Sequence, residues 1–330
     1  MHATTQATID KLVTNAEHDR RCIICSDKTL GRELARLAKA GELVSPWRGM
    51  YASPEVWNEL KPTEKTRRIV RTLAQKYPDW TFCEVTAALM HGLEVTYQDL
   101  LPLHVAVTND CRSRSSKMIR RHPMAQVDIE EADGVRVTSL KQTVLDCLVE
   151  LDFKRALAIA DSALRVGNMT KDELKNYIKG QKDCRGRDRT LEVVAWANPL
   201  AANGGESVAR ASIIEQGFMV PDLQVAVPNV IEGGEPYYAD FMWNLADGTR
   251  VAGELDGLDK YVDPKMTGGK SVARVMSNER RRESRLGAAN IRVMRFSYAE
   301  VEDADKFWRI LTAYGIPRGP ARPHGKVGKG

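Results

Sequence analysis

The sequence predicts a multidomain chain that joins α/β and α+β parts. Its 330 residues, 43% of them hydrophobic, are enough to bury more than one core. An amphipathic helix and a short hairpin stand near the start, and the order helix, three strands, helix, strand stands near the end. We therefore expect a winged helix-turn-helix domain over 1–56, a mixed α/β domain over 57–190, an αβββαβ domain over 191–317 and a disordered basic tail over 318–330.

The first domain is predicted from helical periodicity followed by a turn. Residues 7–18 are compatible with a helix, and 29–40 form a clearer one, with three leucines at i, i+4 and i+7 and Gly41 directly after its end. The segment LVSPWRGMYAS then reads as a two-stranded wing. The candidate DNA contacts are the basic residues on the helix's other face and the tip of the wing: Arg32, Arg36, Lys39, Trp47 and Arg48. The alternative is a solvated basic helix on a domain that binds no DNA.

The middle of the chain mixes helical and strand patterns. We expect strands at 103–107 and 135–140, and helices at 63–76, 84–90, 141–151, 154–166 and 170–179. A basic run at 111–122 includes Arg112 and Arg114, which we count as candidate DNA contacts; a solvated loop or hairpin is equally compatible with it. The polar segment 181–189 is expected to be a linker or a turn before the next helix.

Composition narrows the class of protein. The net charge of +5 permits nucleic-acid binding without requiring it. No signal-peptide pattern starts the chain and no apolar run could span a bilayer, so we expect a cytoplasmic protein with no membrane partner.

Six cysteines are too few for a disulfide scaffold, and Cys22-x-x-Cys25 lacks the second pair of a structural zinc site, so we expect two apolar core side chains there. None of the six histidines forms a metal-ligand pair at helical spacing.

Four segments of the first 180 residues or so stand out together: LGRELARLAKAGELVSPWRGMYA, AALMHGL at 87–93, VTSLKQTVLDCL at 137–148 and ALAIADSALRVG at 156–167. In their pattern and order these segments resemble the AbiEi-type antitoxins of bacterial type IV toxin–antitoxin systems. The resemblance implies a winged-helix domain that binds operator DNA and represses its own operon. It also implies a mixed α/β domain that opposes a nucleotidyltransferase-like toxin.

The last third is predicted to be one sheet with helices. A helix over 205–216 ends at Gly217, and the strands DLQVAVPNV, PYYADFMW and RVAGELDG follow, the last two joined by an Asp-Gly turn. A loop rich in Gly and Lys at 262–271 is either a phosphate-contacting flap or a flexible connection. A helix over 271–288 and the strand IRVMRFS complete the domain, and we expect this crossover to be right-handed.

Carboxylates gather on the expected strands. Alternation places Glu254 and Asp256 on one face, about 7 Å apart along the backbone. It also places Tyr238, Asp240 and Met242 on one face of the preceding strand. Two like charges on one face need a compensating positive group.

A divalent cation is our expected compensating charge. The hairpin makes Asp240 a neighbour of Glu254, and Glu206 in the first turn of the leading helix closes the cluster, with Asp256 as the fourth acid. Asp240, Glu254 and Glu206 would then hold Mg²⁺ or Mn²⁺ through oxygen ligands. Such an ion activates a water and neutralises charge that develops on a phosphate.

Each acid also has a structural interpretation. The helix dipole alone favours Glu206 at a helix start. Asp240 is able to pair with an arginine such as Arg250, and the two acids of the third strand with Lys260 or with the arginines of NERRRESR.

The acid pattern resembles the PD-(D/E)XK restriction-endonuclease-like superfamily, most nearly its Vsr-like branch. The matching residues are Glu206, Asp240 in ADF and Glu254-x-Asp256 in ELDG, with QVAV before and RVMRF after, over roughly 195–315. The resemblance implies a restriction-endonuclease-like fold and metal-dependent hydrolysis of a DNA phosphodiester, with these acids as catalytic residues.

One position departs from the superfamily pattern. Its usual lysine, two residues after the second acid, is Asp256 here. Lys260 lies four residues further on, and it is our candidate for the missing ammonium, which would stabilise the transition state or orient the water.

Two functions of different classes follow. The first is a Mg²⁺- or Mn²⁺-dependent DNA endonuclease, positioned on double-stranded DNA by its winged helix and acting in defence or toxin–antitoxin biology. The second is a non-catalytic transcriptional regulator or antitoxin, whose partners are operator DNA and a nucleotidyltransferase-like toxin. The full set of acids favours the first and the missing lysine favours the second. An RNA-directed enzyme is a third interpretation, because nothing in the sequence separates DNA from RNA.

Overall fold

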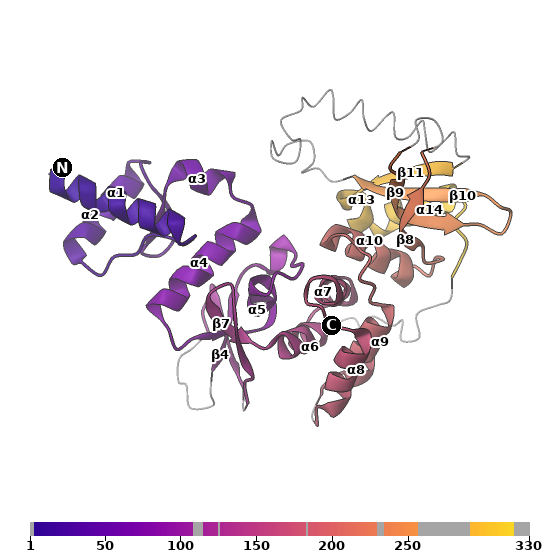
Figure 1. Ribbon diagram of the computed structural model, residues 1–330, viewed down its shortest axis with the longest axis horizontal. Helices are drawn as coiled ribbons and strands as arrows, with labels where there is room; N and C mark the ends of the chain where they lie inside the picture. Colours follow the sequence, from indigo (N-terminus) through magenta and orange to yellow (C-terminus); the bar gives the residue numbers. More distant parts are fainter. Residues whose placement is uncertain are drawn as a thin grey trace. The chain divides into compact units, whose positions relative to one another are not determined.

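The computed structural model describes residues 3–107, 115–124, 126–182, 184–229, 234–256 and 291–319. Contacts divide the chain into two compact units, residues 1–147 and 148–330. Both units contain helices and a sheet (Figure 1), so the predicted combination of α/β and α+β parts is confirmed at that level. The division into four parts at finer boundaries stays a prediction.

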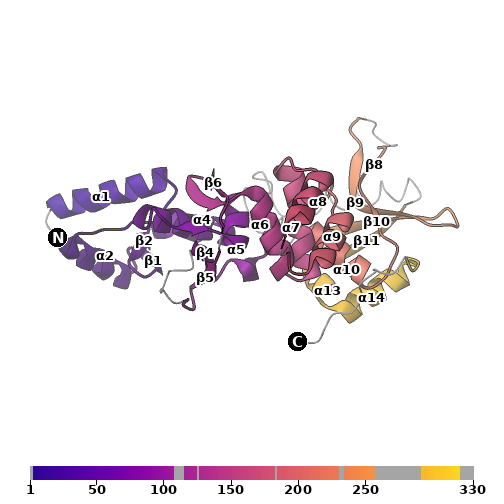
Figure 2. The same cartoon turned by 90° about the horizontal axis from the view of Figure 1, so that it is seen from below.

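The first unit begins with two helices and a hairpin, as the sequence predicts. Helices α1 (Ala3–His18) and α2 (Lys28–Lys39) precede the antiparallel strands β1 (Val44–Trp47) and β2 (Met50–Ala52), and all four are seen together in Figure 2. The Asp27 carboxylate accepts a hydrogen bond from an N–H in the first turn of α2, which fixes where this helix begins.

These elements have a small core of their own. It is built from buried side chains of α1, α2 and the segments beside them: Ile9, Ala16, Ile23, Leu34, Leu37 and Leu43. An isolated bridge between Ile23 and Tyr51 ties the segment before α2 to β2. The leucine spacing that predicted α2 therefore marks the face that this helix buries.

A five-stranded sheet completes the first unit. In spatial order its strands are β5 (Ile119–Pro123), β4 (Leu103–Val107), β3 (Thr81–Phe82), β7 (Val135–Thr138) and β6 (Ile129–Ala132). β4 runs parallel to β5 and antiparallel to β3, while β7 runs parallel to β3 and antiparallel to β6.

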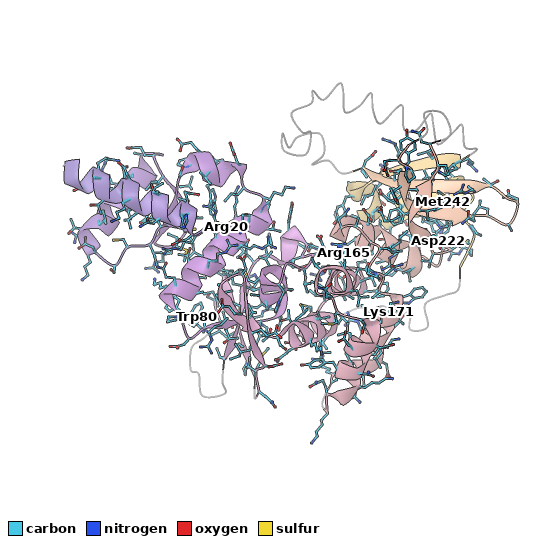
Figure 3. The ribbon with its side chains drawn as sticks, viewed as in Figure 1. Arg20, Trp80, Arg165, Lys171, Asp222 and Met242 are labelled. Carbon is cyan, nitrogen blue, oxygen red and sulfur yellow. The ribbon has the colours of Figure 1, made fainter. Side chains whose placement is uncertain are left out.

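Along the chain, helices come before, between and after these strands. They are α3 (Pro54–Glu59), α4 (Pro62–Lys76), α5 (Glu84–Met90), the 3₁₀ turn η1 (Tyr97–Asp99) and α6 (Leu140–Glu150), which runs across the division between the units. On α4, Glu64 accepts hydrogen bonds at 3.1 Å from both Arg20, labelled in Figure 3, and Arg71.

The basic run at 111–122 is in part a strand, so its interpretation as a loop or hairpin is corrected. Residues 119–123 form β5, an edge strand of the sheet. An edge strand tolerates charged side chains because one side of its backbone has no neighbouring strand, and charge there discourages pairing with another chain. Strands β3 and β6 were likewise not expected from the sequence.

Four helices open the second unit: α7 (Phe153–Val166), α8 (Lys171–Gly180), α9 (Arg187–Trp196) and α10 (Gly204–Glu215). A turn with Gly186 at φ +67 precedes α9, as expected for the polar segment there.

A buried ion pair joins two of these helices. Asp161 of α7 accepts hydrogen bonds at 2.7 Å from Arg210 of α10, through both carboxylate oxygens, and one from Asn198 N at 2.7 Å. The Arg210 side chain is 3% exposed and that of Asp161 is 0% exposed. Burial raises the pKa of Asp161, and the Arg210 guanidinium opposes that shift.

The sheet of the second unit confirms the predicted hairpin succession. Its order is β11 (Ile291–Ser297), β10 (Arg250–Asp256), β9 (Tyr237–Asn244), β8 (Asp222–Val227). β8, β9 and β10 are antiparallel neighbours, whereas β10 and β11 are parallel and therefore need a crossover between them. The expected crossover helix at 271–288, its handedness and the loop at 262–271 lie outside the described residues.

Helices α10, α13 (Tyr298–Glu302) and α14 (Ala304–Ala313) pack with this sheet (Figures 1 and 2). Large buried side chains from the sheet and from α14 form much of the core between them: Phe241, Trp243, Phe296 and Phe307. Asp222 and Met242, labelled in Figure 3, are partners across β8 and β9.

The cysteines in the described part of the chain are free thiols. Cys22 is buried in a core cluster, where burial raises its pKa to about 11, and Cys25 is partly buried. The expectation of apolar packing is confirmed for Cys22. Among the described helices, none has the length and apolar character needed to cross a bilayer.

Replacing Asp161 by Ala should destabilise the second unit by about 3–5 kcal/mol, because the buried Arg210 charge loses its partner. Urea unfolding followed by tryptophan fluorescence measures the change. Lys175→Ala, which removes an exposed partner of Asp172, is the control and should shift stability by less than about 0.5 kcal/mol. Equal stability of Asp161→Ala and the native chain would contradict this account.

Candidate functional site

The two central strands of the second unit separate where the predicted acids begin. The ladder between β9 and β10 runs from Asn244–Arg250 to its last pair, Phe241–Gly253. Beyond that pair, β9 continues to pair with β8 and β10 continues to pair with β11. Asp240 and Glu254 are the next residues on the two strands. They therefore lie at the mouth of a fork in the sheet.

A hydrogen bond closes the inner end of this fork. Asp240 Oδ2 accepts a hydrogen bond from Leu255 N at 3.1 Å, so a carboxylate takes a backbone donor just past the last ladder pair. Glu254, between Gly253 and Leu255, is 5% exposed. The predicted adjacency of Asp240 and Glu254 thus agrees with the strand register.

The sequence did not single out Gln224, which the structure places at the centre of the acids. It lies opposite Asp240 in the register of β8 and β9. Its Nε2 is 3.1 Å from Glu206 Oε2 and 3.5 Å from Asp240 Oδ1, so one amide links the two carboxylates. Its backbone has φ +51, a left-handed conformation that is rare for such a residue and recurs at functional sites.

The alternation expected around Asp240 is not continuous. Met242 packs in the same cluster as Tyr237 and Ala239, although regular alternation would place them on opposite faces. Tyr238 is 52% exposed whereas Met242 is 1% exposed, so the two side chains do not lie in one environment. The expected shared face of Tyr238, Asp240 and Met242 is therefore corrected.

Glu206 reaches this region because α10 starts very close to β10. A Cβ at Gly205 would lie 3.0 Å from Leu255 Cδ2, so the glycine permits the close approach. The Glu206 carboxylate, 3% exposed, accepts hydrogen bonds from Ala202 N at 2.8 Å, Asn203 Nδ2 at 2.7 Å and Gln224 Nε2. These are the contacts of a residue that caps a helix and orients Gln224.

Gly253 is required by the core beneath the fork. A Cβ there would lie 2.9 Å from Trp243 Cζ3 and 3.1 Å from Phe241 Cβ. The Trp243 indole is fixed by its Nε1 donor bond to Met219 O at 2.7 Å. The glycine in the motif Gly-Glu-Leu-Asp thus lets β10 lie over an aromatic ring directly before Glu254.

A positive side chain not expected from the sequence lies beside Asp256. Arg295 of β11 is the register partner of Glu254, and its Nη1 is 3.5 Å from Asp256 Oδ1. Part of the compensating charge that the acids require therefore comes from β11. Lys260, the predicted source of an ammonium, lies outside the described residues.

Distances between possible ligand atoms show which acidic and histidine side chains lie close enough to share one ion. Among the residues that the structure describes, one set of three such atoms lies within 4.8 Å of one another, and it belongs to Glu84, His104 and His122. Glu206, Asp240 and Glu254 do not approach that closely as a set. Their joint role as ligands stays a prediction.

The predicted DNA contacts of the first unit are exposed on α2 and the wing. Arg32, Arg36, Lys39 and Arg48 are exposed, while Trp47 is partly buried against a core cluster. Arg36 is held in place by hydrogen bonds to Glu33, from Nε at 3.0 Å and Nη2 at 2.9 Å. Arg112 and Arg114 lie outside the described residues.

The wing lies beside the described end of the basic run. A cavity of about 570 Å³ is lined by residues of β1 and its turn and by residues at the start of β5: Ser45, Pro46, Trp47, Arg48, Ser116, Met118 and Ile119. In the same strand, Arg121 lies over the ring of Trp80, labelled in Figure 3, at 5.0 Å from its centroid. Two of the predicted DNA contacts, Trp47 and Arg48, thus line this hollow of the first unit.

Comparison with known proteins gives relatives without a described activity. No family model matches the chain. Two Mycobacterium tuberculosis proteins named as uncharacterized, Rv2248 of strain H37Rv and MT2308 of strain CDC 1551, are each 26% identical over 226 residues, which cover 68% of this chain and 78% of theirs. The crystal structure of RV2827C from the same organism covers 56% of this chain and 70% of its own, with 12% identity and a TM-score of 0.32.

Gly253→Ala should destabilise the second unit by about 1–3 kcal/mol, because the added Cβ must displace the ring of Trp243. Thermal unfolding followed by tryptophan fluorescence is the measurement. Gly180→Ala is the control, since a Cβ at Gly180 meets nothing within 4 Å. Similar melting temperatures for both variants would show that β10 has room to move away from Trp243.

Proposed function

We propose that the protein is a DNA-binding, metal-dependent endonuclease, with its hydrolytic site at the fork between β9 and β10. The observation that carries the proposal is the end of the ladder at Phe241–Gly253, which leaves Asp240 and Glu254 side by side on separating strands. Such a fork opens a sheet edge where an ion and a phosphate can reach both carboxylates. The resemblance to the PD-(D/E)XK superfamily names the same residues.

The donor set at the fork fits Mg²⁺ or Mn²⁺. Carboxylate oxygens are the ligands these hard cations prefer, and few protein ligands leave positions for water and a phosphate oxygen. Asp240 and Glu254 would hold the ion, which would supply an activated water and neutralise charge on the phosphate. Glu206 acts through Gln224, whose amide fixes the orientation of Asp240.

Two basic side chains, Arg295 and Lys260, also have roles in the proposed site. Arg295 contacts Asp256 at 3.5 Å and faces Glu254 across β10 and β11. It keeps Asp256 from adding an uncompensated negative charge where a phosphate must approach. Lys260 is proposed to supply the transition-state contact that the superfamily's lysine makes.

The first unit is proposed to hold the chain on double-stranded DNA. Exposed cations on α2 and at the wing tip would contact phosphates, and the hollow beside the wing would accept a sugar or base edge. A helix that presents arginines and lysines opposite a leucine core is typical of such modules.

A non-catalytic regulator is the second candidate. Asp256 at the position of the superfamily's lysine favours this candidate. Arg295, a nearby positive side chain, is already paired with that acid and does not replace the lysine. In this case the fork is a retained scaffold, and the chain acts as an operator-binding antitoxin of a type IV system whose partner is a nucleotidyltransferase-like toxin.

Incubation of supercoiled plasmid with the full chain and Mn²⁺ should give nicked and linear products. Glu254→Gln and Asp240→Asn should each reduce the rate at least about 100-fold, since each removes a proposed ligand charge. Glu302→Gln, an exposed acid on α13, is the matched control and should cleave like the native chain. Absence of Mn²⁺-dependent products, with intact DNA binding, would favour the regulator instead.

Arg36→Ala combined with Arg48→Ala should weaken duplex binding and flatten its dependence on salt. Loss of two phosphate contacts should reduce the slope of log K against log[salt] by about 1.8. Fluorescence anisotropy at several salt concentrations measures this slope. The control, Lys11→Ala with Lys76→Ala, removes the same charge from exposed positions on α1 and α4. Identical slopes for the two double variants would place DNA elsewhere on the protein.

A further inference from the structure

The first unit contains a compact set of metal-ligating side chains that plays no part in the proposed nuclease. Three neighbouring segments supply them: Glu84 from the first turn of α5, His104 from β4 and His122 from β5. Glu84 is 6% exposed and His104 is 7% exposed, and His122 is partly buried. Their possible ligand atoms all lie within 4.8 Å of one another.

The distances within this set are short. His104 Nδ1 is 2.7 Å from Glu84 Oε2, and His122 Nδ1 is 2.7 Å from Glu84 Oε1. His122 Nε2 is 3.0 Å from the same Nδ1 of His104, and the two rings are stacked with centroids 5.0 Å apart. One carboxylate and one ring nitrogen from each of the two histidines therefore lie close enough to share one ion.

The carboxylate serves both rings at once. When each histidine is protonated at Nδ1, each ring donates a hydrogen bond to one oxygen of Glu84. The same three side chains suit a cation, because one deprotonated nitrogen of each ring and the carboxylate can then direct lone pairs toward one ion.

The carboxylate is positioned between the two histidines. Each of its oxygens lies 2.7 Å from the Nδ1 of one ring. The backbone of Glu84 has φ +47, a left-handed conformation at the first residue of α5. A non-glycine residue in that conformation is strained. Such strain persists where the surrounding structure holds the residue in place, and it clusters at functional sites.

We propose that Glu84, His104 and His122 bind one divalent transition-metal ion of the zinc class. Two imidazoles and one carboxylate are a donor set that suits Zn²⁺ and its neighbours in the first transition series better than Mg²⁺. Three protein ligands leave at least one position for water or another ligand. The site differs in donor chemistry from the all-carboxylate fork between β9 and β10.

The test is titration of the metal-free full chain with Zn²⁺ by calorimetry, with Co²⁺ absorption as a second probe of ligand type. One ion per chain should bind at this site, with a visible Co²⁺ band that reports nitrogen ligands. Glu84→Gln and His122→Ala should each weaken binding by more than the roughly 10–100-fold typical of changes outside the ligand shell. His122→Asp, which replaces one ligand by another, should recover part of the affinity.

Two controls separate this site from other causes. His91→Ala changes a histidine of the same unit that contacts Thr138 O at 2.8 Å and should leave binding unchanged. Asp240→Asn removes the proposed nuclease ligand and should also leave it unchanged. Circular dichroism establishes that each variant is folded. The proposal is overturned if the native chain binds no Zn²⁺, if folded Glu84→Gln binds it as tightly, or if Asp240→Asn alone abolishes binding.

Discussion

The structure of the second unit depends on how it accommodates three carboxylates where α10 meets the sheet. Glu206 of α10 and Glu254 of β10 are almost fully buried, and Asp240 lies on the inner strand β9. Buried carboxylates are tolerated only where donors or cations compensate them. Here the donors are the amide of Gln224, backbone N–H groups at Ala202 and Leu255, and the Asn203 cap.

This compensation explains why the sheet divides. Leu255 N lies just beyond the last paired residues of β9 and β10. It donates its hydrogen bond to the Asp240 carboxylate and not to the backbone of β9. The strands remain paired with their outer neighbours, so the fork opens without loss of the sheet. Two glycines allow the dense packing around it, Gly205 below Leu255 and Gly253 above Trp243. The acids are thereby fixed by rigid elements rather than by loops, as a site for positioned chemistry requires.

Local patterns in the sequence were sufficient to predict most helices and strands and to place Asp240 beside Glu254. Leucine spacing located α2, and the Asp-Gly turn set β9 beside β10. What depends on long-range contacts was missed. The amide of Gln224 and the register of Arg295 follow from pairings between strands, and β3 has only two residues. His104 and His122 lie on two parallel strands, so no local spacing in the sequence could bring them to Glu84.

The proposed nuclease requires Asp240 and Glu254 to share a divalent cation at the fork. Anomalous diffraction from crystals of the full chain soaked in Mn²⁺ locates such an ion. A peak is expected within about 2.5 Å of an oxygen of each residue, with waters in the remaining positions. A map in which the Arg295 guanidinium fills the space between the two carboxylates, with no Mn²⁺ peak there, would contradict the proposal.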